Sequence, residues 1–350
     1  MSGLYEYELG KAADTLCREL FKLKSGETCV ITADTESDRR VVDATARAAF
    51  SCDAKPMVIT LASPLGVGKA ADEMLPVEAL TACLKEADAW IELNNQWLLY
   101  STPYNVAVKE NKKLRYMCLS GLNADMMVRC IGRVDYPLLG EFLDKVYEMT
   151  ISAKHWRLTT PAGENVEFEN STNPNRVYGI DKGYADVPGS HMMSGQIGWT
   201  PEWDTINGTI VFDGSISPPC GLLREPVFLE IEKSRVASIR GGREAGAFEA
   251  WLKSFNDPQM FVLAHICWGF NPGARLTGDI VEDERVWGAT EWGLGNIGAC
   301  LIEPDGIPAA SHTDGISLNT SAWLDGRQVL DRGKVVHEEL IELAKKLGME

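Results

Sequence analysis

The sequence predicts an α/β protein with two domains: an N-terminal Rossmann-like domain on a parallel sheet, followed by a mostly antiparallel β (α+β) domain. Two observations in the 350 residues support this prediction. Short apolar runs alternate with helical patterns up to about residue 150, and hairpin patterns take over from about residue 152. Hydrophobic residues make up 45% of the chain, which is enough for two cores. We therefore expect the domains to span 1–150 and 151–350.

Four short apolar runs are expected to form the strands of the first domain. They are 28–33, 55–62, 87–93 and 114–119. Apolar residues at helical spacing predict helices over 37–50, with Ser37 as the N-cap, and over 76–87. Strands that alternate with helices in this way are typical of βαβ units. The stretch from Gly66 to Gly68 is not a full GxGxxG motif, so a simple loop is favoured over a dinucleotide site.

Hairpin patterns characterise the second domain. The expected strand segments are 155–160 with 165–168, 227–232 with 236–240, 207–213, and 323–336. One clear helix is expected over 244–255. The second domain should therefore be built mainly from antiparallel strands.

Charge and cysteine content exclude several classes of protein. The chain has 34 lysine and arginine residues against 50 aspartate and glutamate residues, a net charge of −16. Because such an acidic surface repels phosphate backbones and anionic lipid, neither nucleic acid nor a membrane is expected as a partner. The nine cysteines are scattered singly, which indicates neither a disulfide framework nor a zinc knuckle. With an acidic N-terminus and no apolar run of about 18 residues, the chain is expected in the cytoplasm.

His312 and Asp314 form the most informative short pattern. They lie two residues apart in segment 309–316, and if this segment is a strand, both side chains point to the same face. Such a pair can chelate one metal ion. The same pattern also arises by chance on surface strands, so a metal site needs a third ligand.

His265 is the candidate for that third ligand. It lies in the apolar stretch 261–270, where a hydrogen-bonded core histidine is the more common reading. Together with His312 and Asp314, however, it completes a set of two imidazoles and a carboxylate. This set binds ferrous iron on one face and leaves open positions for oxygen and a chelating substrate. Sequence spacing alone does not bring the three residues together.

Several linked segments carry a resemblance to a known family. They are 181–186, 207–216, 228–242, 255–258 and 265–273. On these segments the chain resembles the bacterial 2,5-dihydroxypyridine 5,6-dioxygenase family. Segment 271–296 is similar to the wider superfamily of aminopeptidase T-like metalloaminopeptidases. The resemblance covers about residues 150–336, and the first domain only in general pattern.

The positions that match metal ligands separate these two branches. The aminopeptidases have a glutamate where this chain has His265, a histidine where it has Glu291, and a further glutamate where it has Gln196. In the dioxygenase family the ligands are two histidines and an aspartate, and His265, His312 and Asp314 match them. The resemblance therefore implies one Fe(2+) ion.

Two positions depart from the dioxygenase pattern. In a segment resembling 97–103, the family is thought to use a histidine base, and this chain has Tyr100 there. A tyrosine donates or relays a proton, but its ordinary pKa of about 10 makes it a poor base at neutral pH. The family is apolar at the position of Glu291, which leaves three hypotheses for this residue: an extra metal ligand, an anchor for a substrate amine, or the end of a surface strand.

Three further residues are candidates for the substrate site. His191 lies in a glycine-rich segment that resembles a histidine-containing loop of the family, which implies substrate binding or proton transfer; an exposed loop histidine without a role is the alternative. Trp199 and Trp292 are candidates to stack on a planar ring near the metal. No acidic partner is expected for His155 or His337, and both are interpreted as structural.

The resemblance implies a mononuclear non-haem Fe(II) ring-cleaving dioxygenase that acts on 2,5-dihydroxypyridine or a related hydroxylated heteroaromatic. For 2,5-dihydroxypyridine the product would be N-formylmaleamate. The partners would be a small-molecule substrate and O2, in a homo-oligomer like those of the relatives. Two alternatives stay open: a metal-dependent hydrolase or aminopeptidase using Glu291 with His265, His312 and Asp314, and a binding protein that kept only the fold.

Overall fold

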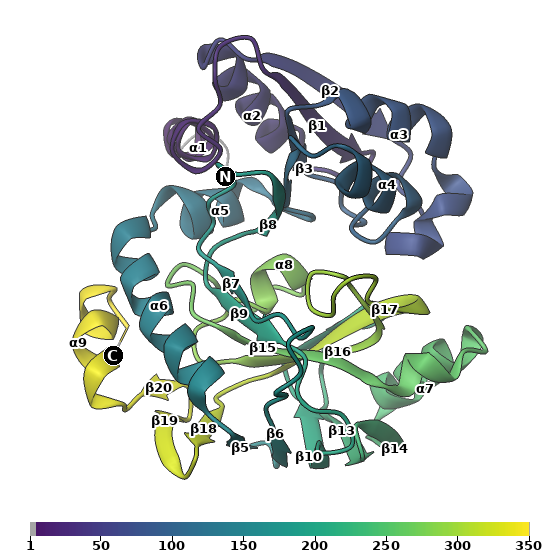
Figure 1. Ribbon diagram of the computed structural model, residues 1–350, viewed down its shortest axis with the longest axis vertical. Coiled ribbons are helices and arrows are strands. Elements are labelled where there is room, and N and C mark those ends of the chain that lie inside the picture. The colour runs from purple at the N-terminus through teal and green to yellow at the C-terminus, as the bar shows by residue number, and fades with distance from the viewer. Residues whose placement is uncertain (1–4, 350) are drawn as a thin grey trace. The chain divides into compact units, whose positions relative to one another are not determined.

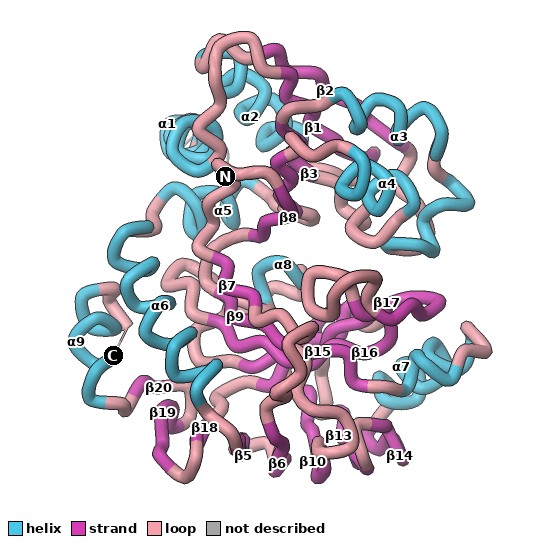
Figure 2. The backbone as a smooth tube through the Cα atoms, viewed as in Figure 1, coloured by secondary structure: helices cyan, strands magenta, loops and turns pink. Residues whose placement is uncertain are grey.

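The computed structural model describes residues 5–349, which form two units (Figure 1). The first unit comprises Met1–Val134 and Asp181–Ser194, and the second comprises Asp135–Ile180 and Gly195–Glu350. Helices and strands alternate along the first unit, whereas strands predominate in the second (Figure 2). The predicted fold class, a parallel-sheet α/β domain and an antiparallel β domain, is therefore confirmed.

The first unit is built on a parallel sheet of five strands in the order β2-β1-β3-β4-β8. The strands are β1 (Thr28–Asp34), β2 (Lys55–Leu61), β3 (Ala89–Glu92), β4 (Arg115–Cys118) and β8 (Gly189–Met192). The helices are α1 (Glu6–Asp14), α2 (Arg39–Ser51), α3 (Val77–Glu86), α4 (Thr102–Glu110) and α5 (Ala124–Met127), with short 3-10 and π turns between them. The four strands and two helices expected here are all present. Strands β2 and β3 lie on opposite sides of β1, so the chain changes its direction of travel across the sheet after β2, as in doubly wound folds.

The N-cap of helix α2 lies one residue after the predicted cap, Ser37. Asp38 is the N-cap, and its side chain accepts a hydrogen bond from the backbone N–H of Arg40. The hydroxyl of Ser37 instead donates to the carbonyl oxygen of Leu93 at 2.8 Å. Ser37 thus links the start of α2 to the end of the neighbouring strand.

The last strand of this sheet comes from a return of the chain. Strand β8 pairs in parallel with β4, with Met117 opposite His191. The expected single boundary near residue 150 did not include this return, which follows helix α6 (Tyr136–Ser152) and strand β7 (Gly179–Asp181) of the second unit. His191 therefore lies in a paired strand, and its expected place in a loop is wrong. Apolar residues are sparse in β8, so its sequence gave no strand signal.

The second unit contains two antiparallel sheets. The eight-stranded sheet has the order β14-β13-β10-β6-β5-β18-β19-β20, and the seven-stranded sheet has the order β12-β11-β17-β16-β15-β9-β7. The strands of the first are β5 (His155–Thr159), β6 (Asn165–Glu169), β10 (Asn207–Phe212), β13 (Val227–Glu232), β14 (Arg235–Gly241), β18 (Ser321–Leu324), β19 (Arg327–Asp331) and β20 (Lys334–Val335). Those of the second, besides β7, are β9 (Gln196–Trp199), β11 (Ser215–Ser217), β12 (Gly221–Leu222), β15 (Leu263–Gly269), β16 (Thr290–Ile297) and β17 (Ile307–Ser317).

Three more helices complete the second unit besides α6. They are α7 (Arg243–Ser254), which matches the expected helix, α8 (Ile280–Asp283) and α9 (Glu338–Lys346). Helix α9 packs beside α6 (Figure 1). Within the described part of the chain, no helix combines the length and the apolar character that crossing a bilayer requires.

Aromatic side chains pack the two sheets of the second unit together. The ring of Trp156 lies 4.8 Å from that of Trp199 and 5.0 Å from that of Trp268, centroid to centroid. Phe168 meets Trp292 edge to face at 5.6 Å. Because Trp156 and Phe168 come from one sheet and the other rings from the second sheet, these contacts are the core of the unit.

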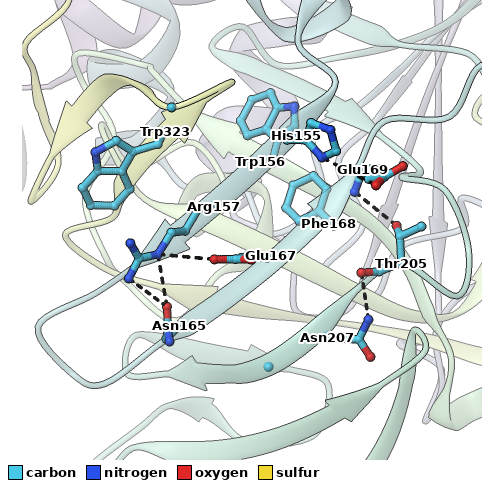
Figure 3. A pocket seen from close by; sticks show the side chains of 12 residues that line it. His155, Trp156, Arg157, Asn165, Glu167, Phe168, Glu169, Thr205, Asn207 and Trp323 are labelled. Atoms are coloured by element: carbon cyan, nitrogen blue, oxygen red, sulfur yellow. Dashed lines mark hydrogen bonds and ion pairs between the residues drawn. The ribbon is translucent and has the colours of Figure 1, made fainter.

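The outer face of the eight-stranded sheet carries a hollow of about 920 Å³ (Figure 3). Arg157, Glu167 and Trp323, which are opposite one another on adjacent strands, are among its lining residues. The guanidinium of Arg157 lies over the Trp323 ring at 5.5 Å. Nδ1 of His155 lies 3.5 Å from Oε1 of Glu169 there, so the expectation that His155 has no acidic partner is wrong. This hollow has no clustered metal donors among the described residues.

Truncation of Trp156 should destabilise the second unit strongly. We expect Trp156→Ala to lower the free energy of unfolding by about 3–5 kcal/mol, because it leaves a cavity between the sheets. Trp323→Ala, on the outer face, is the matched control and should cost less than about 1 kcal/mol. Urea unfolding followed by circular dichroism measures both. Equal losses for the two variants would show that the intersheet layer is not the core.

Glu92 is a buried carboxyl group at the end of β3 in the first unit. Its Oε1 accepts hydrogen bonds from the backbone N–H of Leu98 at 2.5 Å and from the Ser120 hydroxyl at 3.0 Å. Its Oε2 accepts from the Tyr116 hydroxyl at 2.5 Å. Burial outweighs these bonds and raises the pKa of Glu92 from 4.5 to about 7.

This raised pKa predicts a pH dependence of stability. The folded state binds the proton more tightly than the unfolded state, so the stabilisation is complete below the unfolded pKa of 4.5 and is lost as pH rises through about 7. We expect the wild type to lose roughly 3 kcal/mol over this interval that Glu92→Gln does not lose. Urea unfolding of both proteins across the interval measures the difference, and parallel pH profiles would contradict the assignment.

Candidate metal centre

Three adjacent strands of the seven-stranded sheet carry the candidate ligands. His265 lies on β15, and His312 and Asp314 lie on β17, with β16 between them. On β16, Gly293 is opposite both His265 and Asp314, and Gly295 is opposite His312. Directly opposed residues of antiparallel strands point to the same face. The pairing therefore brings the three side chains together on one face.

The donor atoms of this triad are close enough to share one ion. The Nε2 atoms of His265 and His312 are 3.2 Å apart, and Asp314 Oδ1 lies 2.8 Å from His312 Nε2 and 3.6 Å from His265 Nε2. Two bonds of about 2.1 Å at a right angle place their donors roughly 3 Å apart. The two imidazoles and the carboxylate therefore fit one face of a metal coordination sphere.

Gly293 makes room for the first imidazole. A Cβ atom at this position would lie 2.5 Å from Nε2 of His265 and 2.6 Å from Cε1. Any side chain at 293 would therefore displace the ring from the donor cluster. The smallness of this residue is part of the construction of the site.

The protonation states of the triad suit a cation. Burial lowers the pKa of His265, so its ring is neutral and offers a lone pair. Although burial acts to raise the pKa of Asp314, the neighbouring groups, His312 first and then His265, together outweigh it and lower that pKa. Nδ1–H of His312 donates a hydrogen bond to the backbone carbonyl oxygen of Asn296 at 2.8 Å, which leaves the lone pair of Nε2 free to bind a metal.

Glu291 and Cys267 project from the same face, beside His265. They are opposite each other on β16 and β15. Glu291 Oε2 lies 3.4 Å from Nδ1 of His265, and Cys267 Sγ lies 3.7 Å from the same nitrogen. Glu291 is 0% exposed, so its interpretation as the end of a surface strand is wrong. Burial and then the charge of Asp314 raise the pKa of Glu291 well above its usual range.

Cys267 was not singled out in the sequence, although the signal was present. A residue two positions after a ligand on a strand shares the ligand's face. Cys267 therefore had to lie beside His265 once the segment was taken as a strand. His265, Cys267 and Glu291 together form a second group of potential metal donors.

Gln196 is held away from any ligand role by polar neighbours. Its Nε2 donates to Glu284 Oε2 at 2.9 Å, and its Oε1 accepts from Arg285 Nη2 at 3.0 Å. Arg285 also pairs with Glu284. A neutral amide fixed in this way does not supply the charge that a second divalent metal would need.

Trp199 and Trp292 lie on the opposite face of the sheet from the triad. Both are opposite Ile266, the residue that follows His265 on β15, so their side chains point the other way. Both are 0% exposed and pack in the intersheet core. The structure therefore contradicts the prediction that they stack on a substrate ring beside the metal.

The two predicted proton-transfer residues belong to the first unit. Tyr100 precedes α4 with a φ of +71°, an uncommon backbone conformation for a residue with a side chain, and its ring meets that of Tyr104 edge to face at 6.2 Å. His191 Nε2 lies 2.8 Å from the carbonyl oxygen of Val187. Burial lowers the pKa of His191, so the ring is neutral at pH 7. The roles of both residues stay predictions.

Comparisons with known proteins identify the family of this chain. The family model described as 2,5-dihydroxypyridine 5,6-dioxygenase matches residues 15–337. The chain belongs to this family. The resemblance inferred from the motifs of the second half is thereby confirmed, and the match extends it over most of the first domain.

Individual relatives agree with this membership. A 2,5-dihydroxypyridine 5,6-dioxygenase of Pseudomonas putida KT2440 is 42% identical over 107 residues, which are 29% of this chain and 31% of the relative. The match thus spans about a third of that protein. The solved structure of 2,5-dihydroxypyridine dioxygenase from the same organism superposes with a TM-score of 0.78 at 21% identity, covering 96% of this chain and 99% of that one. Wild-type AmpT from Thermus thermophilus superposes with a TM-score of 0.67 at 13% identity, covering 95% and 100%. Both structures have the same fold as this chain.

Removal of one triad member should abolish metal binding. We expect His312→Ala to lose the ion, because the remaining two donors no longer define a coordination face. His155→Ala, which changes an exposed histidine on the other sheet, should bind as the wild type does. Metal content after anaerobic loading with Fe(II) and desalting is the measurement. Full retention of iron in His312→Ala would exclude the triad as the binding site.

Proposed function

We propose that this protein is a mononuclear non-haem Fe(II) dioxygenase that opens the ring of 2,5-dihydroxypyridine or a closely related hydroxylated heteroaromatic. The observation that carries the proposal is the buried cluster of His265, His312 and Asp314 in a chain of the 2,5-dihydroxypyridine 5,6-dioxygenase family. This donor set suits ferrous iron in enzymes that use O2. The substrate is proposed from the two Pseudomonas putida relatives, which are 2,5-dihydroxypyridine dioxygenases.

The chain's own residues would hold the ion and keep water away from it. His265 and His312 would bind through Nε2 and Asp314 through Oδ1. When bound, ferrous iron would supply the redox chemistry toward O2 and a positive charge for a deprotonated ring hydroxyl. The triad side chains are each less than a tenth exposed, so little solvent reaches the donors. Three strands of one sheet fix their positions.

Ring opening between C5 and C6 would incorporate both atoms of O2 and yield N-formylmaleamate. The balance needs no external reductant, since 2,5-dihydroxypyridine and one O2 together contain all the atoms of the product. Proton handling is assigned to Tyr100 and His191 as part of the proposal. The lowered pKa of His191 favours the neutral ring, which accepts a proton, and the phenol of Tyr100 donates or relays one.

A metal-dependent hydrolase is the weaker candidate. The second donor group around Glu291 is the feature that favours it. Two observations count against a hydrolase. The position of Gln196 carries a neutral amide that is hydrogen-bonded to Arg285, and the 13% identity to AmpT supports a common fold only. We therefore retain the dioxygenase as the proposed activity.

Location and assembly belong to the same proposal. The acidic charge and the nine free cysteines, none in a disulfide among the described residues, support a reducing compartment such as the cytoplasm. A homo-oligomer is proposed by analogy with the relatives. The expected partners are the small-molecule substrate and O2.

Oxygen uptake tests the activity directly. Protein loaded anaerobically with Fe(II) and mixed with 2,5-dihydroxypyridine should consume one O2 per substrate and form N-formylmaleamate. Zn(II)-loaded protein and His312→Ala should be inactive, because neither offers a redox-active ion at the triad. An oxygen electrode and mass spectrometry of the product give the answer. Iron-loaded protein that leaves O2 and this substrate unchanged would refute the substrate assignment.

A further inference from the structure

The two imidazoles of the triad differ in what faces their outer nitrogens. For His312 the partner of Nδ1 is the backbone carbonyl oxygen of Asn296, at 2.8 Å. For His265 two groups lie beside Nδ1: the carboxyl of Glu291, with Oε2 at 3.4 Å, and the thiol of Cys267, with Sγ at 3.7 Å. A metal-bound histidine needs an acceptor for its outer N–H, because that bond fixes the tautomer and the orientation of the ring.

Glu291 is in turn a carboxyl that requires a partner. It is completely buried, and neither of its oxygens makes a hydrogen bond of good geometry among the described residues, although Asp314 and Cys267 lie close enough to shift its pKa. A buried polar group without a partner is destabilising, and more so when it is charged. A neighbouring ring N–H would satisfy it, and shortening the 3.4 Å gap by about half an ångström gives a hydrogen bond of normal length.

We propose that Glu291 is a positioning residue for the metal site: its carboxyl accepts a hydrogen bond from Nδ1–H of His265 and so directs the Nε2 lone pair to the ion. The proposal rests on the proposed function, in that the triad holds the metal. Glu291 reaches this position because it lies one pleat from Gly293, the residue directly opposite His265. The hydrogen bond forms with the carboxyl in either protonation state, since both offer an acceptor oxygen.

Cys267 offers a competing arrangement that the test must separate. His265 Nδ1, Cys267 Sγ and a Glu291 oxygen lie within 4.8 Å of one another and would form a second metal site. In that case Nδ1 of His265 would bind a metal and carry no proton. The presence or absence of a proton on Nδ1 therefore distinguishes a positioning carboxylate from a second ligand set.

Three variants isolate the role of the carboxyl. Glu291→Gln keeps an acceptor oxygen, and Glu291→Met keeps the approximate length of the side chain but removes the acceptor. Glu164→Gln is the matched control. Glu164 is also fully buried, and its pKa is raised by burial to about 7, but it contacts Ser317, whose side chain is on the sheet face opposite the triad.

Proton NMR of Co(II)-substituted protein detects the Nδ1–H protons of His265 and His312 as separate signals. The wild type should show two hyperfine-shifted, solvent-exchangeable N–H signals from the two bound imidazoles. In Glu291→Met the His265 signal should be lost to exchange with water while the His312 signal, protected by Asn296, stays in place. Glu291→Gln and Glu164→Gln should keep both signals. A merely structural role for Glu291 would disturb the two signals together.

Metal affinity gives an independent readout that needs no substrate. In anaerobic competition titrations with Fe(II), Glu291→Met should bind about 10–100-fold more weakly, and Glu291→Gln and Glu164→Gln should remain close to wild type. Two unchanged N–H signals and unchanged affinity in Glu291→Met would overturn the proposal. So would two Co(II) ions per chain with one N–H signal, which indicates the second ligand set.

The outcomes for Glu291 and for the proposed activity are separable. Metal binding with the expected N–H pattern but no oxygen uptake would refute the activity and leave Glu291 as the positioning residue. Oxygen uptake by the wild type, together with unchanged N–H signals and metal affinity in Glu291→Met, would support the activity and refute the positioning role of Glu291. Failure of the wild type to bind any Co(II) or Fe(II) would refute both.

Discussion

The pleat of three antiparallel strands is the constraint on which the site depends. Alternate residues of β15, β16 and β17 point to opposite faces, so the triad projects from one side of these strands while Trp268 of β15 and Trp292 of β16 project from the other. The tryptophan face is locked against the eight-stranded sheet by ring contacts. Because that face is buried, a slip of one residue would expose the tryptophans and bury the donors in the core. Packing energy therefore fixes the positions of the ligands.

Electrostatics then determine what this arrangement can bind. Burial would penalise a charged imidazole, and the lowered pKa of His265 keeps that ring neutral. Asp314 is the triad member that carries negative charge, because its pKa is lowered beside His312. A site with two neutral nitrogens and one carboxylate leaves a divalent ion partly uncompensated, so it suits an anionic ring oxygen as a further ligand. Glu291, with its strongly raised pKa, adds little negative charge.

Much of this fold follows from local patterns. The run at 28–33 and the hairpin at 155–168 are strands because their apolar residues have the period of a fully buried and a half-buried strand, respectively. The pair His312 and Asp314 could be placed on one face from their spacing alone. Strand β8 could not be predicted, since its pairing with β4 depends on a return of the chain that leaves no periodic signal.

The convergence of the site was only partly predictable. That His265 meets His312 depends on the register of β16 against both neighbours, a long-range property that spacing does not encode. The assignment of Trp199 and Trp292 to the substrate is wrong because the register of β9 and β16 against β15 places both rings on the face opposite His265, and sequence spacing does not encode that register. The burial of Glu291 was likewise a property of the packed sheet and not of its own segment.

A crystal grown anaerobically with Fe(II) and measured at the iron absorption edge tests the central claim most directly. The account predicts one anomalous peak per chain, bound by Nε2 of His265, Nε2 of His312 and a carboxylate oxygen of Asp314. A peak between Cys267 and Glu291, or rings of His265 and His312 that bind no common ion, would contradict it.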